Sequence, residues 1–354
     1  MGRSAYSRFT VALLVVVACA FLLPTGAAGQ DTGRNNEQNN EQNNGQPSGV
    51  FATTIDLSDD ERTLVDQAVR TCLPGYEYIS IALVQDGRTI YSASYGRDRR
   101  GEVEVYASVT KPVTATITMM LVDEGVIGDL DDPISDYTNR FDNILPARMA
   151  NRRITFRHLL AHQSGLPEQA PLVRFRPWPF LFAPGTNTSY STWGYGLLGA
   201  VLEDITGVSY EELVRTMIGA PVGADSFRAD NLLFDTPGGR VYSTIEDMAR
   251  FAIGISEFTY LPEEIIRDEV IPVQGYDGEE YLGTGWFVTQ PADCSVTIYH
   301  AGSNGKPRAF LAVKPFVGRA VCIAGMNRSA DGADDFGLLA VDLMSILNRM
   351  AGEP

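Results

Sequence analysis

The chain has 354 residues, of which 44% are hydrophobic and 20% are charged, and its formal net charge at pH 7 is −16. This hydrophobic content is enough for one large core or two closely joined subdomains, and it excludes a largely disordered protein. The acidic charge and the lack of a long basic segment make nucleic acid and anionic membrane surfaces poor partners.

The first residues are typical of an export signal. Arg3 and Arg8 precede an uncharged run over residues 9–29 that is apolar at its centre and ends in small residues, as in secretory signals. Because this run is about as long as a membrane-spanning helix, we expect residues 1–29 to be either a signal peptide or an uncleaved anchor. Cys19 loosely resembles a lipidation site, although apolar residues follow it. We therefore expect a secreted or extracytoplasmic protein with a possible membrane tether.

Residues 30–53 are predicted to form a disordered linker. They repeat Asn, Glu and Gln and contain almost no hydrophobic residue, so burial would not offset the entropy lost on ordering. Such a segment is a flexible tether between the N-terminus and a folded domain, which we expect over residues 54–354.

Local patterns predict the first elements of that domain. Ser58 and Glu61 have the spacing of a capping box, which indicates a helix that runs to about residue 72. Asp86-Gly87 separates two runs rich in β-branched and aromatic residues, which predicts a hairpin. Hydrophobic residues at helical spacing then predict a helix from about residue 109 to 126.

Residues 106–270, approximately, are predicted to form an inserted all-helical subdomain, because Pro and Gly interrupt mostly helical patterns there. Strand-like runs follow at 285–289, 296–299, 308–313 and 320–324, and an amphipathic helix begins near Phe336. This order predicts an α+β fold, an α/β sandwich in which N- and C-terminal helices flank one antiparallel sheet. We expect the functional site in the cleft between the two parts.

Ser108 and Lys111 are the first candidates for catalysis. At a helix start, three residues apart, they lie on one face, and a serine hydroxyl needs a base to act as a nucleophile. A lysine with its ordinary pKa of about 10.4 is neutral at pH 7 only at a cost of about 4–5 kcal/mol, which burial and the positive end of a helix reduce. Ser303 and Lys306 have the same spacing but lie in a Gly-rich turn.

Three short segments occur in a recognisable order. They are Ser108-Val-Thr-Lys111, Tyr190-Ser-Thr192 and His300-Ala-Gly302. Together they resemble the Ser-x-x-Lys, Tyr-x-Asn and Lys- or His-x-Gly signature of serine β-lactamases, penicillin-binding proteins and related esterases. The resemblance covers about residues 55–350 and is closest to the class C β-lactamase-like branch, which includes D-aminopeptidases and D-alanyl carboxypeptidases.

The resemblance implies a role for each position. Ser108 would be the nucleophile, Lys111 its base and Tyr190 a proton shuttle. The backbone N–H groups of Ser108 and of Ser303, the residue after Gly302, would hold the oxyanion. The family needs neither metal nor cofactor, and the substrate would be a small ester, a peptide or a β-lactam.

Two departures from the signature bear on the substrate. Thr192 offers one hydroxyl where the family usually has the amide of Asn. His300, with an ordinary pKa of about 6.5, is mostly neutral at pH 7.5 and would hold a substrate carboxylate less well than a lysine. We therefore expect small esters to react faster than β-lactams or D-alanyl peptides, and carboxylate-bearing substrates to improve as the pH falls toward 6.

These observations favour an exported serine hydrolase that cleaves small esters or D-amino-acid-type peptides. A β-lactamase is one alternative. The other is a non-catalytic binder of peptides or cell-wall fragments that keeps the fold. Thr192 favours this alternative, whereas the intact Ser108, Lys111 and Tyr190 argue against it.

The remaining histidines and cysteines give weaker signals. His158 and His162 stand four apart on a predicted helix, a spacing that can bind a metal, but no third ligand is evident. If Cys19 is removed with the signal, three cysteines remain, enough for at most one disulfide. These are Cys72, Cys294 and Cys322.

Overall fold

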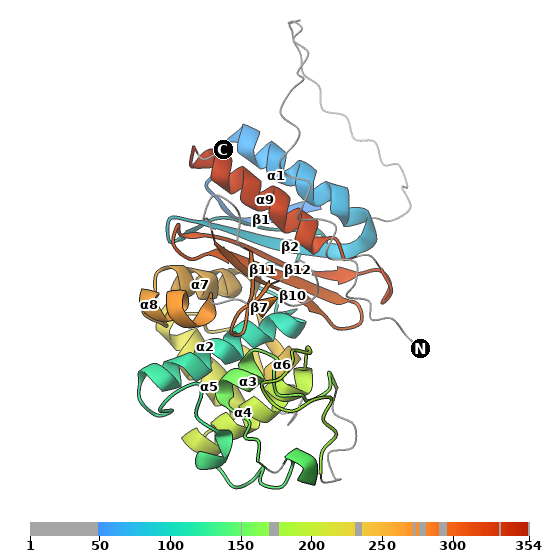
Figure 1. Ribbon diagram of the computed structural model, residues 1–354. Coiled ribbons are helices and arrows are strands. Elements are labelled where there is room, and N and C mark those ends of the chain that lie inside the picture. Colours follow the sequence, from blue (N-terminus) through green and yellow to red (C-terminus); the bar gives the residue numbers. More distant parts are fainter. Residues whose placement is uncertain are drawn as a thin grey trace, which may run out of the picture.

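The computed structural model describes residues 49–149, 151–169, 177–230, 236–271, 274–275, 281–289, 296–332 and 334–352 (Figure 1). The expected signal or anchor at 1–29, residues 30–48 of the expected linker, and Cys294 lie outside the described residues. Among the described residues, no helix combines the length and the apolar character needed to cross a membrane.

A nine-stranded antiparallel sheet forms the centre of the molecule. Its strand order is β1-β3-β2-β12-β11-β10-β9-β8-β7, so the first and last thirds of the chain build one sheet. The strands are β1 (Gly49–Ile55), β2 (Tyr76–Gln85), β3 (Arg88–Gly96), β7 (Gln274–Gly275), β8 (Tyr281–Leu282), β9 (Phe287–Thr289), β10 (Thr297–Ser303), β11 (Pro307–Lys314) and β12 (Arg319–Asn327).

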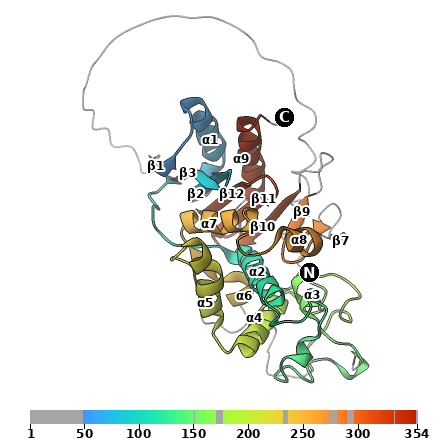
Figure 2. The same cartoon turned by 90° about the vertical axis from the view of Figure 1, so that its left-hand side faces the viewer.

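Helices cover both faces of this sheet (Figures 1 and 2). The N-terminal helix α1 (Asp59–Cys72) and the C-terminal helix α9 (Phe336–Met350) pack together on one face. The segment between β3 and β7 covers the other face, where α7 contacts the central strands. This segment contains α2 (Thr110–Asp123), α3 (Phe156–Leu160), α4 (Thr192–Thr206), α5 (Tyr210–Leu213), α6 (Thr236–Gly239), α7 (Ile245–Ser256) and α8 (Glu263–Ile265).

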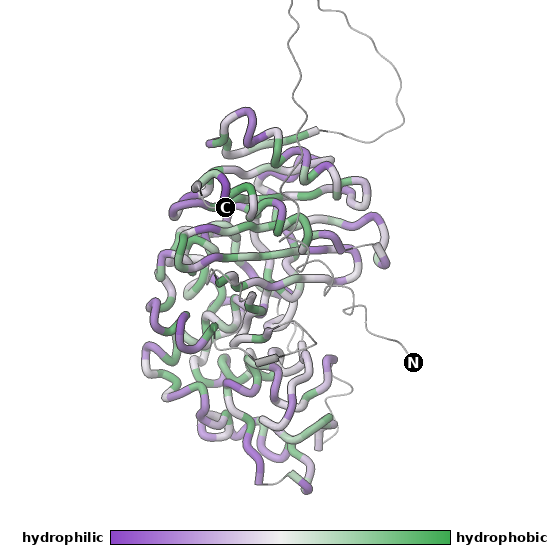
Figure 3. The backbone as a smooth tube through the Cα atoms, turned by 45° about the horizontal axis from the view of Figure 1, so that its top comes forward, coloured by the Kyte–Doolittle hydropathy of each residue, from purple (hydrophilic) through white to green (hydrophobic). Residues whose placement is uncertain are grey.

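Burial on both faces explains why the central strands are rich in hydrophobic residues, with green stretches along much of the tube in the middle of Figure 3. In β2, Ile79, Ile81 and Leu83 belong to the core under α1 and α9, whereas Ala82 and Val84 belong to the core shared with the inserted segment. Successive side chains of a strand point to opposite faces, so β2 contributes to two cores at once. The predicted α+β fold, with N- and C-terminal helices flanking an antiparallel sheet, is confirmed.

The local patterns of the N-terminal half are also confirmed. Ser58 caps α1, and its side chain and that of Glu61 make the reciprocal bonds of a capping box. Asp86 and Gly87 have φ values of 51° and 70° between β2 and β3, as the tightest hairpin turns require. Helix α2 spans Thr110–Asp123 within the predicted range.

Two features differ from the expectations. Residues 49–53 belong to β1, which pairs with β3, so the predicted linker extends five residues too far. Val50 and Ala52 pack on the core, and this burial stabilises the edge strand. The inserted segment also holds two short strands, β5 (Arg228–Ala229) and β6 (Val241–Ser243), which form a small sheet with β4 (Glu104–Val105).

Candidate active site

Ser108 lies in a single 3₁₀ turn, η3 (Ala107–Val109), directly before α2. Ala107 has a φ of 45°, a left-handed conformation that costs a residue with a Cβ about 1–2 kcal/mol. Ser108 is half-buried, whereas both its neighbours are buried. The strained turn thus presents the Ser108 side chain at the start of a buried helix.

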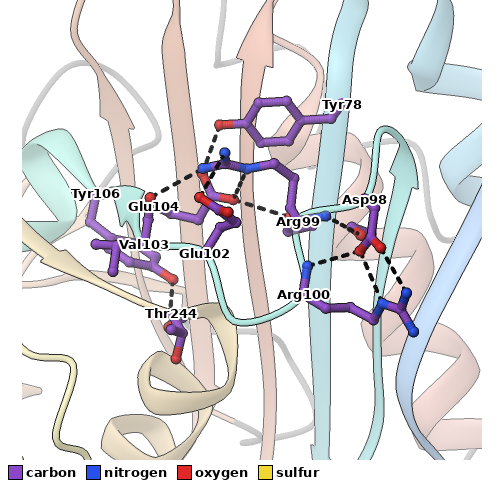
Figure 4. A network of polar contacts seen from close by, with 11 residues as sticks. Tyr78, Asp98, Arg99, Arg100, Glu102, Val103, Glu104, Tyr106 and Thr244 are labelled. Carbon is purple, nitrogen blue, oxygen red and sulfur yellow. Dashed lines mark hydrogen bonds and ion pairs between the residues drawn. The ribbon is translucent and has the colours of Figure 1, made fainter. Parts of the chain in front are cut away.

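A buried polar network holds the segment that leads into this turn (Figure 4). Glu104, which is 3% exposed, accepts hydrogen bonds from Tyr78 Oη at 2.7 Å and from Arg99 Nε at 3.1 Å. Tyr106 donates from its hydroxyl to Thr244 O at 3.2 Å, and its N–H donates to Val241 O at 3.2 Å. These contacts hold both ends of residues 99–106 in place, so the segment that precedes the strained turn is fixed and the turn keeps its conformation.

Lys111 is the most deeply buried charged group of the site, with none of its surface exposed. Its Nζ lies 3.2 Å from Ser108 Oγ, 3.3 Å from Thr192 Oγ1 and 2.6 Å from Gly238 O. Burial lowers the pKa of Lys111 to about 7, although the carboxylate of Glu168 opposes this shift. A large fraction of Lys111 is therefore neutral near pH 7, as a general base must be.

The three oxygen partners of Lys111 match the needs of a neutral amine. Such an amine has two N–H donors and one lone pair. Gly238 O can only accept, so one N–H goes to it at 2.6 Å. The hydroxyl of Thr192 can accept the second, which leaves the lone pair facing the Ser108 hydroxyl at 3.2 Å. This geometry allows proton transfer from Ser108 to Lys111.

Gly238 was not among the residues singled out from the sequence. A Cβ at Gly238 would lie 2.7 Å from Thr192 Cγ2 and 2.9 Å from Thr192 O, so glycine permits the close approach of α6 to the start of α4. The pair of glycines at 238–239 was the available signal. Nothing in their sequence context pointed to a lysine 127 residues away.

Tyr190 lies over the same amine. Its ring centroid is 4.7 Å from Lys111 Nζ, and it packs at 4.4 Å against the ring of His162 and at 6.3 Å against that of His300. The structure therefore gathers Ser108, Lys111, Tyr190, Thr192 and His300 around one point, from segments as far apart as η3, α4 and β10.

The third motif reaches Ser108 through β10. A Cβ on Gly302 would lie 2.3 Å from Tyr106 O and 3.2 Å from Ser108 N, so only glycine lets this strand approach the Ser108 amide. Ser303 follows at the end of β10 with an exposed side chain. Lys306, of the second Ser-x-x-Lys pattern, is exposed and bonds Glu77 Oε1 at 3.3 Å; residues 304–306 form no helix.

His300 differs from the expectation in one respect. It is 2% exposed, and burial together with the nearby charge of Lys111 lowers its pKa to about 3. Its Nδ1 lies 2.7 Å from Ala301 O, so Nδ1 carries the proton and donates. The predicted gain of charge as the pH falls toward 6 is therefore wrong, because the imidazole stays neutral throughout this range.

The predicted helical pairing of His158 with His162 is also wrong. Helix α3 ends at Leu160, and His162 has a φ of 56°, which turns the chain away from the helix. The Nδ1 atoms of the two rings accept hydrogen bonds from different backbone groups, Thr155 N and Ser191 N. No group of three His, Cys, Asp or Glu side chains suited to a metal occurs within the described ranges. Cys72 and Cys322 are free thiols.

Known proteins share this architecture. A crystal structure of a beta-lactamase/D-alanine carboxypeptidase from Yersinia pestis, complexed with citrate, has a TM-score of 0.67 and 22% identity, and the match covers 83% of this chain and 100% of that one. A structure of a D-stereospecific amidohydrolase from Streptomyces has a TM-score of 0.63 and 19% identity, with 79% and 98% covered. At these identities the likeness supports the fold.

Sequence comparison gives the family. The D-alanyl-D-alanine-carboxypeptidase/endopeptidase AmpH of Escherichia coli is 28% identical over 214 residues, 48% of this chain and 55% of that protein. The chain spans about a third of the length of other curated relatives, such as the beta-lactamase-like proteins 4 and 2 of Dictyostelium discoideum. The family model Beta-lactamase matches residues 65–336. The chain therefore belongs to the beta-lactamase family of serine hydrolase-like proteins.

Proposed function

We propose that this chain is an exported serine hydrolase that forms an acyl-enzyme on Ser108 and prefers small neutral esters to β-lactams and D-alanyl peptides. The observation that carries the proposal is the pairing of Ser108 with Lys111. A fully buried lysine with a pKa of about 7 lies 3.2 Å from a half-buried serine hydroxyl. A structural lysine would need no such environment, whereas a general base does.

In the proposed reaction, Lys111 takes the proton of Ser108 as Oγ attacks the ester carbonyl. The backbone N–H groups of Ser108 and Ser303 stabilise the oxyanion. Tyr190 passes a proton to the leaving alcohol, and the tyrosinate later takes one from the water that hydrolyses the acyl-enzyme. Lys111 returns its proton to Ser108 Oγ as the acid is released. The intact Ser108, Lys111 and Tyr190 speak against the alternative of a non-catalytic binder.

The substrate preference rests on charge. Lys111 is neutral in its working form, and His300 stays neutral above about pH 3. Neither group then offers a substrate carboxylate the positive charge that a lysine in the third motif would supply. A charge-assisted hydrogen bond contributes about 1.5–3 kcal/mol, so its loss lowers kcat/KM about 10- to 150-fold for carboxylate-bearing substrates.

We predict that p-nitrophenyl butyrate is a good substrate and that nitrocefin, which carries a carboxylate, is a poor one. Steady-state kcat/KM for both substrates checks this. The Thr192→Asn variant restores the side-chain amide of the family signature, so it should raise the ratio of nitrocefin to ester turnover. Efficient hydrolysis of nitrocefin by the unmodified protein would contradict the preference and favour the β-lactamase alternative.

The pH dependence follows from Lys111. Because the base form is the active one, kcat/KM for the neutral ester should rise with pH through about 7 and level off above it. His300 titrates near pH 3 and adds no step between about pH 5.5 and 8.5. The ratio of nitrocefin to ester turnover should therefore stay constant over this range. A ratio that increases toward pH 6 would show that His300 gains a charge there, against its burial.

Export rests on the sequence of residues 1–29, with its basic start, apolar centre and small residues. The linker over residues 30–48 would then separate the membrane from the catalytic domain. The intact mass of the protein recovered from cells that produce it distinguishes a cleaved signal from an uncleaved anchor. A full-length protein that stays in the cytosolic fraction would contradict export.

A further inference from the structure

His162 holds both sides of Tyr190. The backbone N–H of Ser189 donates to His162 O at 2.9 Å, and the backbone N–H of Ser191 donates to His162 Nδ1 at 3.0 Å. The ring of His162 also packs on the ring of Tyr190 at 4.4 Å, with an angle of 31° between the planes. His162 thus accepts hydrogen bonds from the residues immediately before and immediately after Tyr190.

His162 lies in a buried part of the chain and has a strained backbone conformation. His162 is 2% exposed and has a φ of 56°, a conformation that histidine and asparagine adopt more readily than most other residues. Burial, Lys111 and His300 hold the pKa of His162 well below its ordinary value. The ring is therefore neutral, so Nδ1 remains an acceptor and the proton lies on Nε2.

The second contact also fixes the start of α4. Ser191 is the N-cap of this helix, and its Oγ accepts from Gly194 N at 2.8 Å while donating to Pro167 O at 2.8 Å. Thr192, which bonds Lys111 Nζ, is the next residue. The Ser191 N–H donates to His162 Nδ1, so His162 also helps to hold this N-cap in place.

We propose that His162 is a positioning residue, which sets the place of the Tyr190 hydroxyl during proton transfer by accepting a hydrogen bond from Ser191 N through Nδ1. The inference rests on the proposed acyl-enzyme chemistry of Ser108. A displacement of a reacting group by about 1 Å can reduce a rate about 100-fold. The effect should be largest where the leaving group needs a proton.

Two substitutions separate the acceptor atom from the ring. His162→Asn keeps an acceptor near the position of Nδ1, tolerates the positive φ and removes the ring. His162→Phe keeps a ring and removes the acceptor. The readout is kcat/KM for phenyl acetate, whose leaving group is the more basic of the two, relative to that for p-nitrophenyl acetate, whose leaving group needs little help from an acid. Tyr190→Phe gives the reference value for complete loss of the proton donor.

We expect His162→Phe to lose about 100-fold on phenyl acetate and much less on p-nitrophenyl acetate, as Tyr190→Phe does. His162→Asn should keep the ratio of the unmodified protein. In a Tyr190→Phe background, His162→Phe should not lower the ratio of phenyl acetate to p-nitrophenyl acetate turnover any further, because both changes remove the same function. If His162→Phe does not fold, His162→Gly removes the acceptor without backbone strain and should show the same loss.

His158→Phe is the matched control. His158 is half-buried and also accepts a backbone N–H through Nδ1, from Thr155 at 3.3 Å, but this contact caps α3 and not the Tyr190 segment. The His158→Phe substitution should lower the midpoint of thermal unfolding. It should leave unchanged the ratio of kcat/KM for phenyl acetate to that for p-nitrophenyl acetate (the leaving-group ratio). A normal ratio in His162→Phe, or a lowered ratio in His162→Asn alone, would overturn the proposal.

Failure of the proposed function would look different. In that case the unmodified protein would neither hydrolyse the two esters nor react with a fluorophosphonate at Ser108, and the inference about His162 would fall with it. If the unmodified protein is active and labelled, the leaving-group ratios of the His162 variants test the positioning role by itself.

Discussion

Ser108→Ala is expected to abolish the hydrolysis of activated esters, with a loss of about 10⁴- to 10⁶-fold in kcat, because it removes the hydroxyl on which the proposed acyl-enzyme forms. The fold should remain intact. Ser108 is half-buried, and Lys111 Nζ keeps its bonds to Gly238 O and Thr192 Oγ1 without it. Initial rates with p-nitrophenyl acetate and the midpoint of thermal unfolding, measured on the same preparation, check both statements.

Ser303→Ala is the matched control for this variant. Ser303 heads the second Ser-x-x-Lys pattern, but its side chain is exposed and the proposed contribution of this position is its backbone N–H. It should therefore retain most of the activity. An inactive Ser303→Ala protein beside an active Ser108→Ala protein would mean that the nucleophile has been assigned to the wrong pattern.

Lys111→Arg is expected to fail nearly as completely as Lys111→Met, with a loss of about 10²- to 10⁴-fold in kcat/KM for esters. A guanidinium has a pKa above about 12 and cannot accept the proton of Ser108. Lys111→Met has a similar volume and removes the base without adding a charge to a fully buried position. Ester hydrolysis across the pH range, with thermal unfolding to confirm the fold, provides the measurement.

Lys306→Arg serves as the control for this substitution. Lys306 is exposed and forms an ion pair with Glu77 at 3.3 Å, which an arginine can also make, so activity should not change. Substantial activity in Lys111→Arg would show that the positive charge of this residue is what matters, and that the base lies elsewhere.

Much of the fold could be predicted because its signals are local. The capping box of Ser58 and Glu61 and the turn at Asp86-Gly87 depend on a few adjacent residues, and both occur as expected. The edge strand β1 was not predicted, because its short run follows a long polar segment and becomes ordered only by pairing with β3. The small strands β5 and β6 likewise exist through pairing with each other and with β4.

The site divides in the same way. Ser108 and Lys111 could be recognised because the spacing along a helix start brings the two side chains together. The contacts of the Gly238 carbonyl with Lys111 and of His162 with the Tyr190 segment could not be recognised. Both involve backbone atoms, which are the same in every residue and give no sequence pattern. The pKa of His300 was misjudged because its burial is a tertiary property. His300 is 2% exposed only because β10 packs against the inserted segment.

The central claim, a live nucleophile at Ser108 activated by Lys111, is tested most directly by mass spectrometry of the intact protein after treatment with a fluorophosphonate. Such reagents modify activated serine hydroxyls and leave ordinary ones untouched. We predict one adduct per chain, mapped to Ser108 by peptide analysis, and none in Ser108→Ala or Lys111→Met. An unmodified protein, or an adduct on Ser303 or any other serine, would contradict the account.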